Sequence, residues 1–417
     1  MAESSALFAA IGHRNPTLCR IAAESGGTVH VGDVCDGASI ARFAVDMDID
    51  IALVSSDDPL EAGVVDALID AGIRTVGPTR SGAEIEWNKD FSRHVVHEVA
   101  PAANPTFAIA RTEAEARRAV SVVGEAGAVA IKPLGLAGGK GVKVVGPHLA
   151  DNAAALAYAL EIIDTGRSGG GVVVEERVLA PEFTIQAMTD GVTVVIPPAT
   201  YDYPYRFAGD TGPGTGGMGT CTLPGGLLPF IDAATYDEAC DIVRATIDLL
   251  ARQGRPFSGC LNAGFFATDH GLRVIEFNAR FGDPEGINIM ALITSDWMDA
   301  LEAIEAHELD DGTISLNDAA SLVTYLVSPE YAIGQSTGHR FTVDEAAIEQ
   351  AGAYALFSAA VDAGDGTFET VGTSRALAIV TTSPTIDEAR RATRQAIEVG
   401  VSGDLEWRDD IGTFPPQ

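Results

Sequence analysis

The stretch Val274-Ile-Glu-Phe-Asn-Ala-Arg-Phe-Gly-Asp-Pro-Glu285 is typical of a strand that ends in a turn. Glu276 and Asn278 are two positions apart on the predicted strand Arg273–Asn278, so their side chains point to the same face. Two oxygen ligands on one face suit Mg²⁺ or Mn²⁺, which completes its coordination with substrate phosphate oxygens. Arg280 continues the alternation and could reach a transferring phosphoryl group. The alternative is a polar strand edge that binds nothing.

A glycine-rich segment with lysines, Ala130-Ile-Lys-Pro-Leu-Gly-Leu-Ala-Gly-Gly-Lys-Gly-Val-Lys143, lies earlier in the chain. Lys132 ends one predicted strand, and Lys140 lies in the loop before the next strand, Val142–Val145. The loop glycines are Gly135, Gly138, Gly139 and Gly141. Glycines let backbone N–H groups approach phosphate oxygens, and lysines neutralise phosphate charge. The spacing excludes a Walker A loop, and the strand that follows excludes a dinucleotide fingerprint.

Acidic residues follow the next predicted strand, Gly171–Glu176. Glu175 and Glu176 end this strand, and Glu182 lies six or seven positions further on. Such a hinge can offer backbone groups to an adenine edge and a carboxylate to ribose hydroxyls. An acidic strand end without a ligand remains the alternative.

The segment Asp210-Thr-Gly-Pro-Gly-Thr-Gly-Gly-Met-Gly219 carries five glycines in ten residues. We expect neither a helix nor a regular strand there. Because the loop is rich in backbone donors, it is typical of a cradle for an anion or small substrate. A flexible loop without a ligand is the alternative.

The amino-acid composition and the net charge limit the classes of protein to which this chain can belong. The 417 residues include 59 acidic and 27 basic side chains, for a formal net charge of -32. The mean hydropathy of +0.15 favours a folded chain over a disordered one. Because phosphate backbones would be repelled, nucleic-acid binding is disfavoured. Only four of the 27 basic residues are lysines. The low lysine content and the excess of acidic residues together predict a halophilic protein, in which salt screens the repulsion between the negative charges.

Five widely spaced cysteines predict reduced thiols, not a disulfide framework or a zinc site. We see no signal peptide and no apolar run long enough to span a membrane, so we expect a cytoplasmic protein with no membrane partner.

The sequence predicts several domains of the α/β and α+β classes. Short strands alternate with helices over residues 1–80, including a helix at Pro59–Ala71, which predicts βαβ units and a parallel sheet. A compact α+β unit follows at about 113–186. The last unit contains a predicted strand at Ala353–Val361 and a helix at Thr385–Gly400.

In this order, the four segments resemble the ATP-grasp superfamily, and more closely the phosphoribosylamine–glycine ligase family. The glycine loop 210–219 and the segment Arg280-Phe-Gly-Asp-Pro-Glu285 resemble that family's signatures. Weaker matches extend from about residue 12 to 412: Gly12-His-Arg-Asn-Pro-Thr17, the helix start after Asp58, Gly77-Pro-Thr79 with Lys89, and Arg408-Asp-Asp-Ile-Gly412.

The resemblance implies an ATP-grasp fold: a parallel-sheet N-terminal domain at 1–80, an ATP-grasp core at 81–310 that includes the lid at about 113–186, and a C-terminal α+β domain at 311–417. It implies that ATP, glycine and 5-phosphoribosylamine give ADP, phosphate and glycinamide ribonucleotide through a glycyl phosphate. The partners are then these small molecules, and we expect a monomer.

The resemblance also implies roles for individual residues. Arg280 and Lys140 would be catalytic, and Glu276 and Asn278 would bind Mg²⁺ or Mn²⁺. The ATP-binding residues would be Lys89, Lys132, Gly138, Gly139, Lys140, Glu175, Glu176 and Glu182. The substrate-binding residues would be Asp210, Thr215, Gly216, Gly217, Arg280, Gly282 and Asp283.

The sequence departs from the family pattern at its start, where an opening strand and a Gly-rich turn are usual. We expect one βα unit, roughly 20–25 residues, to lie upstream of Met1. Within the signatures, Gly214 replaces Asn, Tyr205 replaces Lys, and Ile287 replaces Gln. Two other hypotheses stay open: another ATP-grasp carboxylate–amine ligase, and an ATP-binding homologue made inactive by the N-terminal loss.

Overall fold

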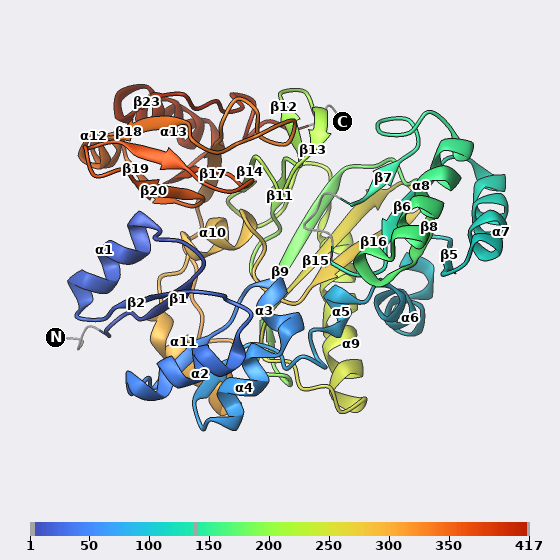
Figure 1. Cartoon of the computed structure of the whole chain (residues 1–417), viewed down its shortest axis with the longest axis horizontal. Coiled ribbons are helices and arrows are strands. Elements are labelled where there is room, and N and C mark those ends of the chain that lie inside the picture. The colour runs from blue at the N-terminus through green and yellow to red at the C-terminus, as the bar shows by residue number, and fades with distance from the viewer. Residues whose placement is uncertain (1–4, 137–140, 415–417) are drawn as a thin grey trace.

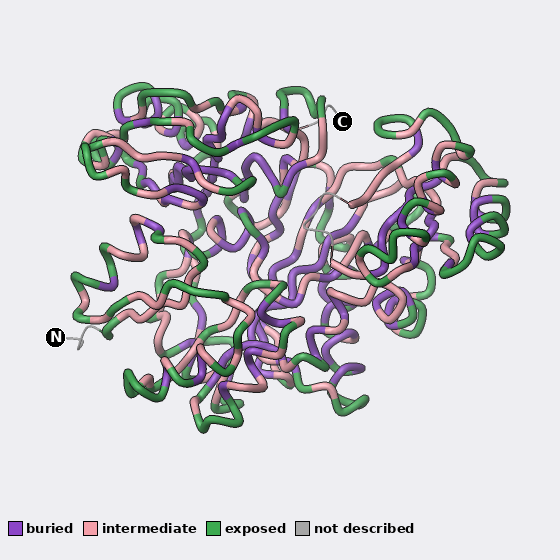
Figure 2. The backbone as a smooth tube through the Cα atoms, in the orientation of Figure 1, coloured by how far each residue is buried: buried purple, intermediate pink, exposed green. Residues whose placement is uncertain are grey.

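The computed structural model describes residues 5–136 and 141–414, so the predicted sites at Gly138, Gly139 and Lys140 lie outside the described residues. Figure 1 shows an N-terminal group of helices and short strands, a central antiparallel sheet, a lid beside it and a C-terminal group of sheets. The buried segments run through the central and C-terminal sheets, and the exposed segments form the outer helices and loops (Figure 2).

The N-terminal segment forms two separate parallel strand pairs, β1 with β2 and β3 with β4, which confirms parallel pairing here. Strand β2 was not predicted, and the single helix expected at Pro59–Ala71 is wrong. Two helices replace it because Gly63, at φ 82°, ends the first one in the left-handed conformation. The elements are β1 (Ala9–Ile11), α1 (Pro16–Ser25), β2 (Val29–Val31), α2 (Gly37–Asp46), β3 (Ile51–Leu53), α3 (Asp57–Ala62), α4 (Val64–Asp70) and β4 (Arg74–Val76).

The unit that we call the lid comprises residues 107–176, where about 113–186 was expected, because residues 182–189 form β9 of the central sheet. It is a four-stranded antiparallel sheet in the order β5-β8-β6-β7, covered by two helices and built around its own hydrophobic cluster. A capping box between Thr112 and Glu115 begins α7. The elements are β5 (Phe107–Ala110), α7 (Glu113–Val123), β6 (Val129–Pro133), β7 (Lys143–Val144), α8 (Asn152–Thr165) and β8 (Val172–Glu176). Two short helices, α5 (Glu84–Trp87) and α6 (Lys89–Val99), lead into it from the N-terminal segment.

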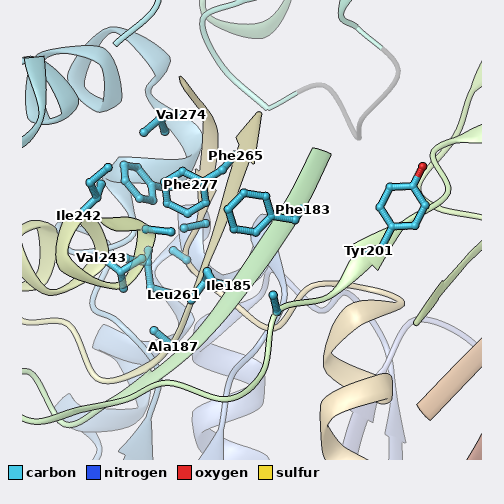
Figure 3. Packing of buried hydrophobic residues seen from close by; sticks show 14 of the residues in the cluster. Phe183, Ile185, Ala187, Tyr201, Ile242, Val243, Leu261, Phe265, Val274 and Phe277 are labelled. Carbon is cyan, nitrogen blue, oxygen red and sulfur yellow. The ribbon is translucent and has the colours of Figure 1, made fainter. Parts of the chain in front are cut away.

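The central sheet has the order β10-β9-β15-β16. The side chains of Phe183, Phe265 and Phe277 meet those of Ile242 and Val243 from helix α9 in one hydrophobic core (Figure 3). This packing fixes one face of the sheet, which leaves the other face for polar side chains. The elements are β9 (Glu182–Thr189), β10 (Val194–Val195), α9 (Ala233–Arg252), β15 (Gly259–Thr268) and β16 (Gly271–Asn278).

The C-terminal segment shares a five-stranded sheet, β11-β14-β17-β22-β19, with strands from residues 201–222. The predicted strand Ala353–Val361 is wrong as a single element, because β19 joins this sheet and β20 joins a second one, β20-β21-β18-β23. The elements are β11 (Tyr201–Asp202), β14 (Gly219–Thr222), β17 (Ala320–Leu326), β18 (Arg340–Val343), α12 (Glu345–Gln350), β19 (Ala353–Phe357), β20 (Ala360–Asp362), β21 (Phe368–Thr370), β22 (Leu377–Ser383), α13 (Ile386–Gly400) and β23 (Val401–Gly403). Helices α10 (Glu285–Met290) and α11 (Trp297–Ala306) connect the central sheet to it.

The glycine loop contains no helix, as expected, but part of it is a short strand with irregular pairing. Strand β13 (Thr211–Gly214) pairs with β12 (Tyr205–Phe207) in an irregular two-stranded hairpin. Gly212, at φ 84°, makes that irregular pairing possible because it has no Cβ.

All five cysteines are free thiols. Over residues 5–136 and 141–414, no helix is long and apolar enough to cross a membrane.

Candidate active site

Four predicted site residues line one cavity of about 90 Å³: Lys89, Glu276, Asn278 and Arg280. Lys89 comes from α6, and the other three come from β16 and the turn after it. Leu136 and Gly141, which flank the loop with Lys140, line the same cavity. The structure therefore brings together two predicted motifs that are more than a hundred residues apart in the sequence.

A β-bulge at Ile275 turns the polar residues of β16 towards this cavity. The pairing with β15 shifts between Gly264 and Phe265, so that Ile275 is an extra residue. Val274 and Phe277 are consequently both buried in the core although they are three positions apart. Without the bulge, strict alternation would direct Glu276 to the core side with Val274.

The bulge also exposes the Ile275 carbonyl, which accepts hydrogen bonds from Lys132 Nζ at 3.0 Å and Arg93 at 2.7 Å. Glu175 joins the same two cations, with its carboxylate 2.8 Å from Lys132 and 2.5 Å from Arg93. Burial would raise the pKa of Glu175, but Arg93 and Lys132 outweigh it and hold that pKa below its usual value. Glu175 thus fixes Lys132 in place here, and its predicted contact with nucleotide stays a prediction.

Lys89 is placed at the first turn of α6 by Asn88, whose side chain accepts a hydrogen bond from the Phe91 N–H. The Lys89 ammonium donates to the Gly135 carbonyl at 3.4 Å. Burial lowers the pKa of Lys89, while the carboxylate of Glu276 acts in the opposite direction. An anion bound in the cavity would therefore restore the charged form of this lysine.

Arg280 is held by Glu86, a residue that no sequence motif indicated. The Arg280 Nε lies 3.3 Å from one Glu86 carboxylate oxygen, and the other oxygen accepts from the Ala279 N–H at 2.8 Å. Burial raises the pKa of Glu86 to about 7, against the lowering influence of Arg280. Sequence reasoning missed Glu86 because its role depends on contacts almost two hundred residues away.

The donor set fits a divalent cation that shares its coordination with phosphate oxygens. The Glu276 side chain makes no hydrogen bond or ion pair with the residues that the structure describes, and Asn278 Oδ1 accepts only a long contact of 3.5 Å from Arg280. Among the described residues, no group of three or more His, Cys, Asp or Glu side chains could hold a metal alone. Two protein oxygens suit Mg²⁺ or Mn²⁺ bound together with a nucleotide.

A second group of predicted residues surrounds the end of the glycine loop. The Thr215 hydroxyl accepts from the Gly217 N–H at 3.1 Å and donates to the Pro204 carbonyl at 2.9 Å. Gly217 has φ 95°, and a Cβ there would come within 2.7 Å of Pro284 and Asp202. The loop therefore lies directly against the turn that follows Arg280.

Arg375, from the C-terminal segment, joins the loop to that turn and was not predicted. Its guanidinium donates to the carbonyls of Gly216 and Gly217 and lies 2.6 Å from the Asp283 carboxylate. The Tyr325 hydroxyl donates to the other Asp283 oxygen at 2.6 Å. The predicted substrate residues Gly216, Gly217 and Asp283 thus meet around one buried arginine.

Gly282 lies where no side chain would fit. Its N–H donates to Gln186 Oε1 at 3.0 Å, and a Cβ would come within 2.7 Å of Gln186, Asn262 and Glu285. Gln186 Nε2 and Asn262 Oδ1 are buried without a hydrogen-bond partner in the described part of the chain. The turn at Gly282 therefore packs closely against two side chains that each carry a polar atom with no partner in the described part of the chain.

The remaining predicted residues lie nearby but have other partners. Glu176 accepts from the Thr106 N–H at 3.1 Å, and Asp210 accepts from Arg408 at 3.0 Å. Glu182 begins β9, and burial raises its pKa to about 7, with Glu276 adding to the effect.

Similarity to known proteins extends over the N-terminal segment and over the segment that contains most of this site. The profile of the family described as "Phosphoribosylglycinamide synthetase, ATP-grasp (A) domain" matches residues 87–286, and the N-domain profile of the same family matches residues 3–86. Among curated proteins, the phosphoribosylamine–glycine ligase of Methanobrevibacter smithii is 39% identical over 92% of this chain and 86% of its own. That of Methanothermobacter thermautotrophicus is 37% identical over 99% of this chain and 92% of its own.

Among solved structures, a phosphoribosylamine–glycine ligase from Thermotoga maritima has a TM-score of 0.78 at 21% identity, covering 97% of this chain and all of that one. A biotin carboxylase from Campylobacter jejuni, solved as a β,γ-ATP complex, has a TM-score of 0.70 at 14% identity, covering 97% and 94%. At these identities the structural likeness shows the fold, which is the ATP-grasp fold.

Proposed function

Because the chain belongs to the phosphoribosylglycinamide synthetase family, we propose that its two neighbouring groups of side chains serve the two half-reactions of a phosphoribosylamine–glycine ligase. The enzyme is an ATP-dependent ligase of purine biosynthesis that forms a carbon–nitrogen bond between glycine and 5-phosphoribosylamine. The single observation that supports our assignment of residues is that Lys89, Glu276, Asn278 and Arg280 share one cavity.

In the first half-reaction, a glycine carboxylate oxygen attacks the γ-phosphorus of ATP, and ADP leaves. Lys89 and Lys132 neutralise phosphate charge, and Arg280 stabilises the charge on the transferring group. Lys140, from the adjoining loop, would add a third ammonium. Glu276 and Asn278 would hold Mg²⁺ or Mn²⁺, which neutralises phosphate charge when bound.

In the second half-reaction, the amine of 5-phosphoribosylamine attacks the acyl carbon of glycyl phosphate, phosphate leaves, and the amine loses a proton. Asp283 and the glycine loop would hold this acceptor, and the loop would exclude water from the acyl phosphate. Gly282 and Asp283 follow closely after Arg280 in the chain. The residues proposed for the two half-reactions can therefore contact the same acyl group.

The test is turnover with purified protein. With ATP, glycine and 5-phosphoribosylamine, we expect glycinamide ribonucleotide by mass spectrometry and one phosphate per product. Glu276→Gln is expected to lose turnover by roughly 100-fold or more, because it removes the charged metal ligand. Glu302→Gln, with a side chain 56% exposed on α11, is the matched control and should keep activity.

Lys140→Ala, in the loop outside the described residues, is expected to abolish turnover and leave the fold intact. ATP binding without turnover in the unaltered chain would contradict the proposal and favour an inactive homologue. Faster turnover of another acid and amine would favour a different ligase.

We also infer that the chain is a halophilic monomer, because a net charge of -32 makes its copies repel one another and requires salt for screening. Light scattering of the protein in molar KCl measures the oligomeric state.

A further inference from the structure

A second cavity, of about 230 Å³, lies in the C-terminal part of the molecule between β17, α13 and residues 407–411. It has room for about seven water molecules. Thr324 of β17 lines it, and the next residue, Tyr325, hydrogen-bonds to Asp283. Because successive residues of a strand point to opposite faces, this cavity lies across the strand from Asp283.

The residues that line this cavity carry more positive than negative charge, in contrast to the net negative charge of the whole chain. Four arginines line it, Arg390, Arg391, Arg394 and Arg408, against two aspartates, Asp387 and Asp409. In the whole chain, acidic residues outnumber basic ones 59 to 27. A local excess of guanidinium groups in so acidic a protein favours an anion.

The arginines differ in how far they are already engaged. Arg408 donates to Asp210, Asp410 and the Tyr205 carbonyl, so its donors are in use. Arg394 is less engaged. Its nearest guanidinium nitrogen is 3.9 Å from an Asp409 carboxylate oxygen, which is a long ion pair, and its Cζ lies 5.8 Å from the centre of the Trp407 ring.

The Arg391 side chain is exposed and has no hydrogen bond or ion pair within residues 5–136 and 141–414. Positions 391 and 394 are one helical turn apart on α13, so both guanidinium groups can reach one ligand.

A buried hydroxyl gives an independent indication of a ligand. Thr324 is 1% exposed, and its Oγ1 has no hydrogen-bond partner in the described part of the chain. Leaving a buried hydroxyl unpaired costs free energy, and such groups are normally satisfied by a ligand or water. Thr324 therefore contributes an unpaired hydroxyl to the lining of the cavity.

We infer that this cavity binds a phosphate group, carried by inorganic phosphate or by a small phosphate monoester. Arginine forks match phosphate oxygens, and a hydroxyl completes their hydrogen bonding. The inference concerns a site separate from the proposed catalytic one and does not depend on it.

The test is isothermal titration calorimetry with inorganic phosphate and, separately, ribose 5-phosphate. Potassium glutamate is the supporting salt, so that chloride does not compete for the guanidinium groups. The Arg391→Gln/Arg394→Gln double variant is expected to weaken binding at this site by roughly tenfold or more. Arg117→Gln removes an exposed arginine elsewhere and should bind as the unaltered protein does.

The Thr324→Val variant tests whether the Thr324 hydroxyl binds the ligand or whether Thr324 only packs against its neighbours. The change keeps the shape of the side chain, and we expect it to weaken binding severalfold while the fold is retained. Tighter binding of inorganic phosphate or of ribose 5-phosphate identifies the source of the phosphate group, and either supports the inference. Absence of binding by both ligands, or equal affinity in the double variant and the Arg117→Gln control, would overturn it.

Discussion

At the scale of single residues, Arg375 shows how one distant side chain can organise a site. It contacts two carbonyls of the glycine loop and the Asp283 carboxylate, and its guanidinium lies 4.5 Å from the Tyr325 ring. A planar fork with several donors can make these contacts together, whereas a lysine ammonium is a point charge. We therefore propose that Arg375 positions the glycine loop and Asp283, on the side of the site assigned above to the acceptor.

We predict that Arg375→Lys lowers kcat/KM by roughly 10- to 100-fold, about 1.4 to 2.7 kcal/mol of transition-state stabilisation. The KM for 5-phosphoribosylamine should rise while the KM for ATP stays unchanged, because the lost contacts lie on the acceptor side. Steady-state kinetics with each substrate varied in turn measures the split. Arg340→Lys, at an arginine that is 54% exposed and paired with Asp365, is the control, and an equal rise in both KM values would argue against the assignment.

Glu182 makes the stability of the ligand-free protein depend on pH. Burial raises its pKa to about 7, above the unfolded value of about 4.3. The folded protein therefore keeps this proton over a range in which the unfolded chain loses it, so the free energy of unfolding falls as pH rises from about 4.3 to 7. The contribution is fully present below the unfolded pKa and is lost above the folded one.

We predict that Glu182→Gln is more stable than the unaltered protein at pH 8, by about 1 to 2 kcal/mol, with a much smaller difference at pH 4.5. Denaturant unfolding at the two pH values, with EDTA and without nucleotide, gives the comparison. Glu24→Gln, on an exposed position of α1, should change neither value. A Glu182→Gln difference that is independent of pH would contradict the titration of the partly buried Glu182 carboxyl as its cause.

At the scale of elements, the glycine loop contains two glycines with opposite requirements. Gly217 has φ 95° and no room for a Cβ, while Gly214 has nothing within 4 Å of a Cβ. We predict that Gly217→Ala destabilises the protein by roughly 2 to 3 kcal/mol and raises the KM for 5-phosphoribosylamine, because the loop must move away from Pro284. Thermal unfolding and kinetics measure both effects.

Gly214→Ala, three residues away in the same loop, is the matched control and should behave as the unaltered protein. Equal tolerance of alanine at both positions would show that the loop does not need its close contact with Pro284.

The sequence predicted most elements and pointed to Lys89, Glu276, Asn278 and Arg280, which line one cavity, because lysine depletion and the spacing of Glu276 and Asn278 are local signals. It did not predict the bulge at Ile275, since a bulge depends on how β16 pairs with β15. Glu86 and Arg375 were missed for the same reason: each acts through partners far away in the chain. Gly63 divided a predicted helix because one left-handed residue outweighed the apolar pattern around it.

At the scale of the whole molecule, the net charge of -32 predicts a dependence on salt. Self-repulsion falls as the screening length shrinks from about 10 Å at 0.1 M to about 3 Å at 1 M salt. We predict that Tm rises by about 5 to 10 °C between 0.1 M and 2 M KCl, as measured by differential scanning fluorimetry. Sorbitol at equal osmolality does not screen charge, and a matching rise in sorbitol, or no rise in KCl, would count against the charge argument.

The five-stranded sheet β11-β14-β17-β22-β19 has a consequence for how this protein can change through evolution. Strand β14 pairs residue for residue with β17, Gly219 opposite Thr324 and Thr222 opposite Ser321, although residues 223–319 lie between the two strands in the sequence. Recombination between two diverged genes within that interval would combine a β14 from one parent with a β17 from the other, and their facing side chains would not have been selected together. The two strands are therefore expected to be inherited as one unit, so that hybrids which keep them from the same parent survive more often.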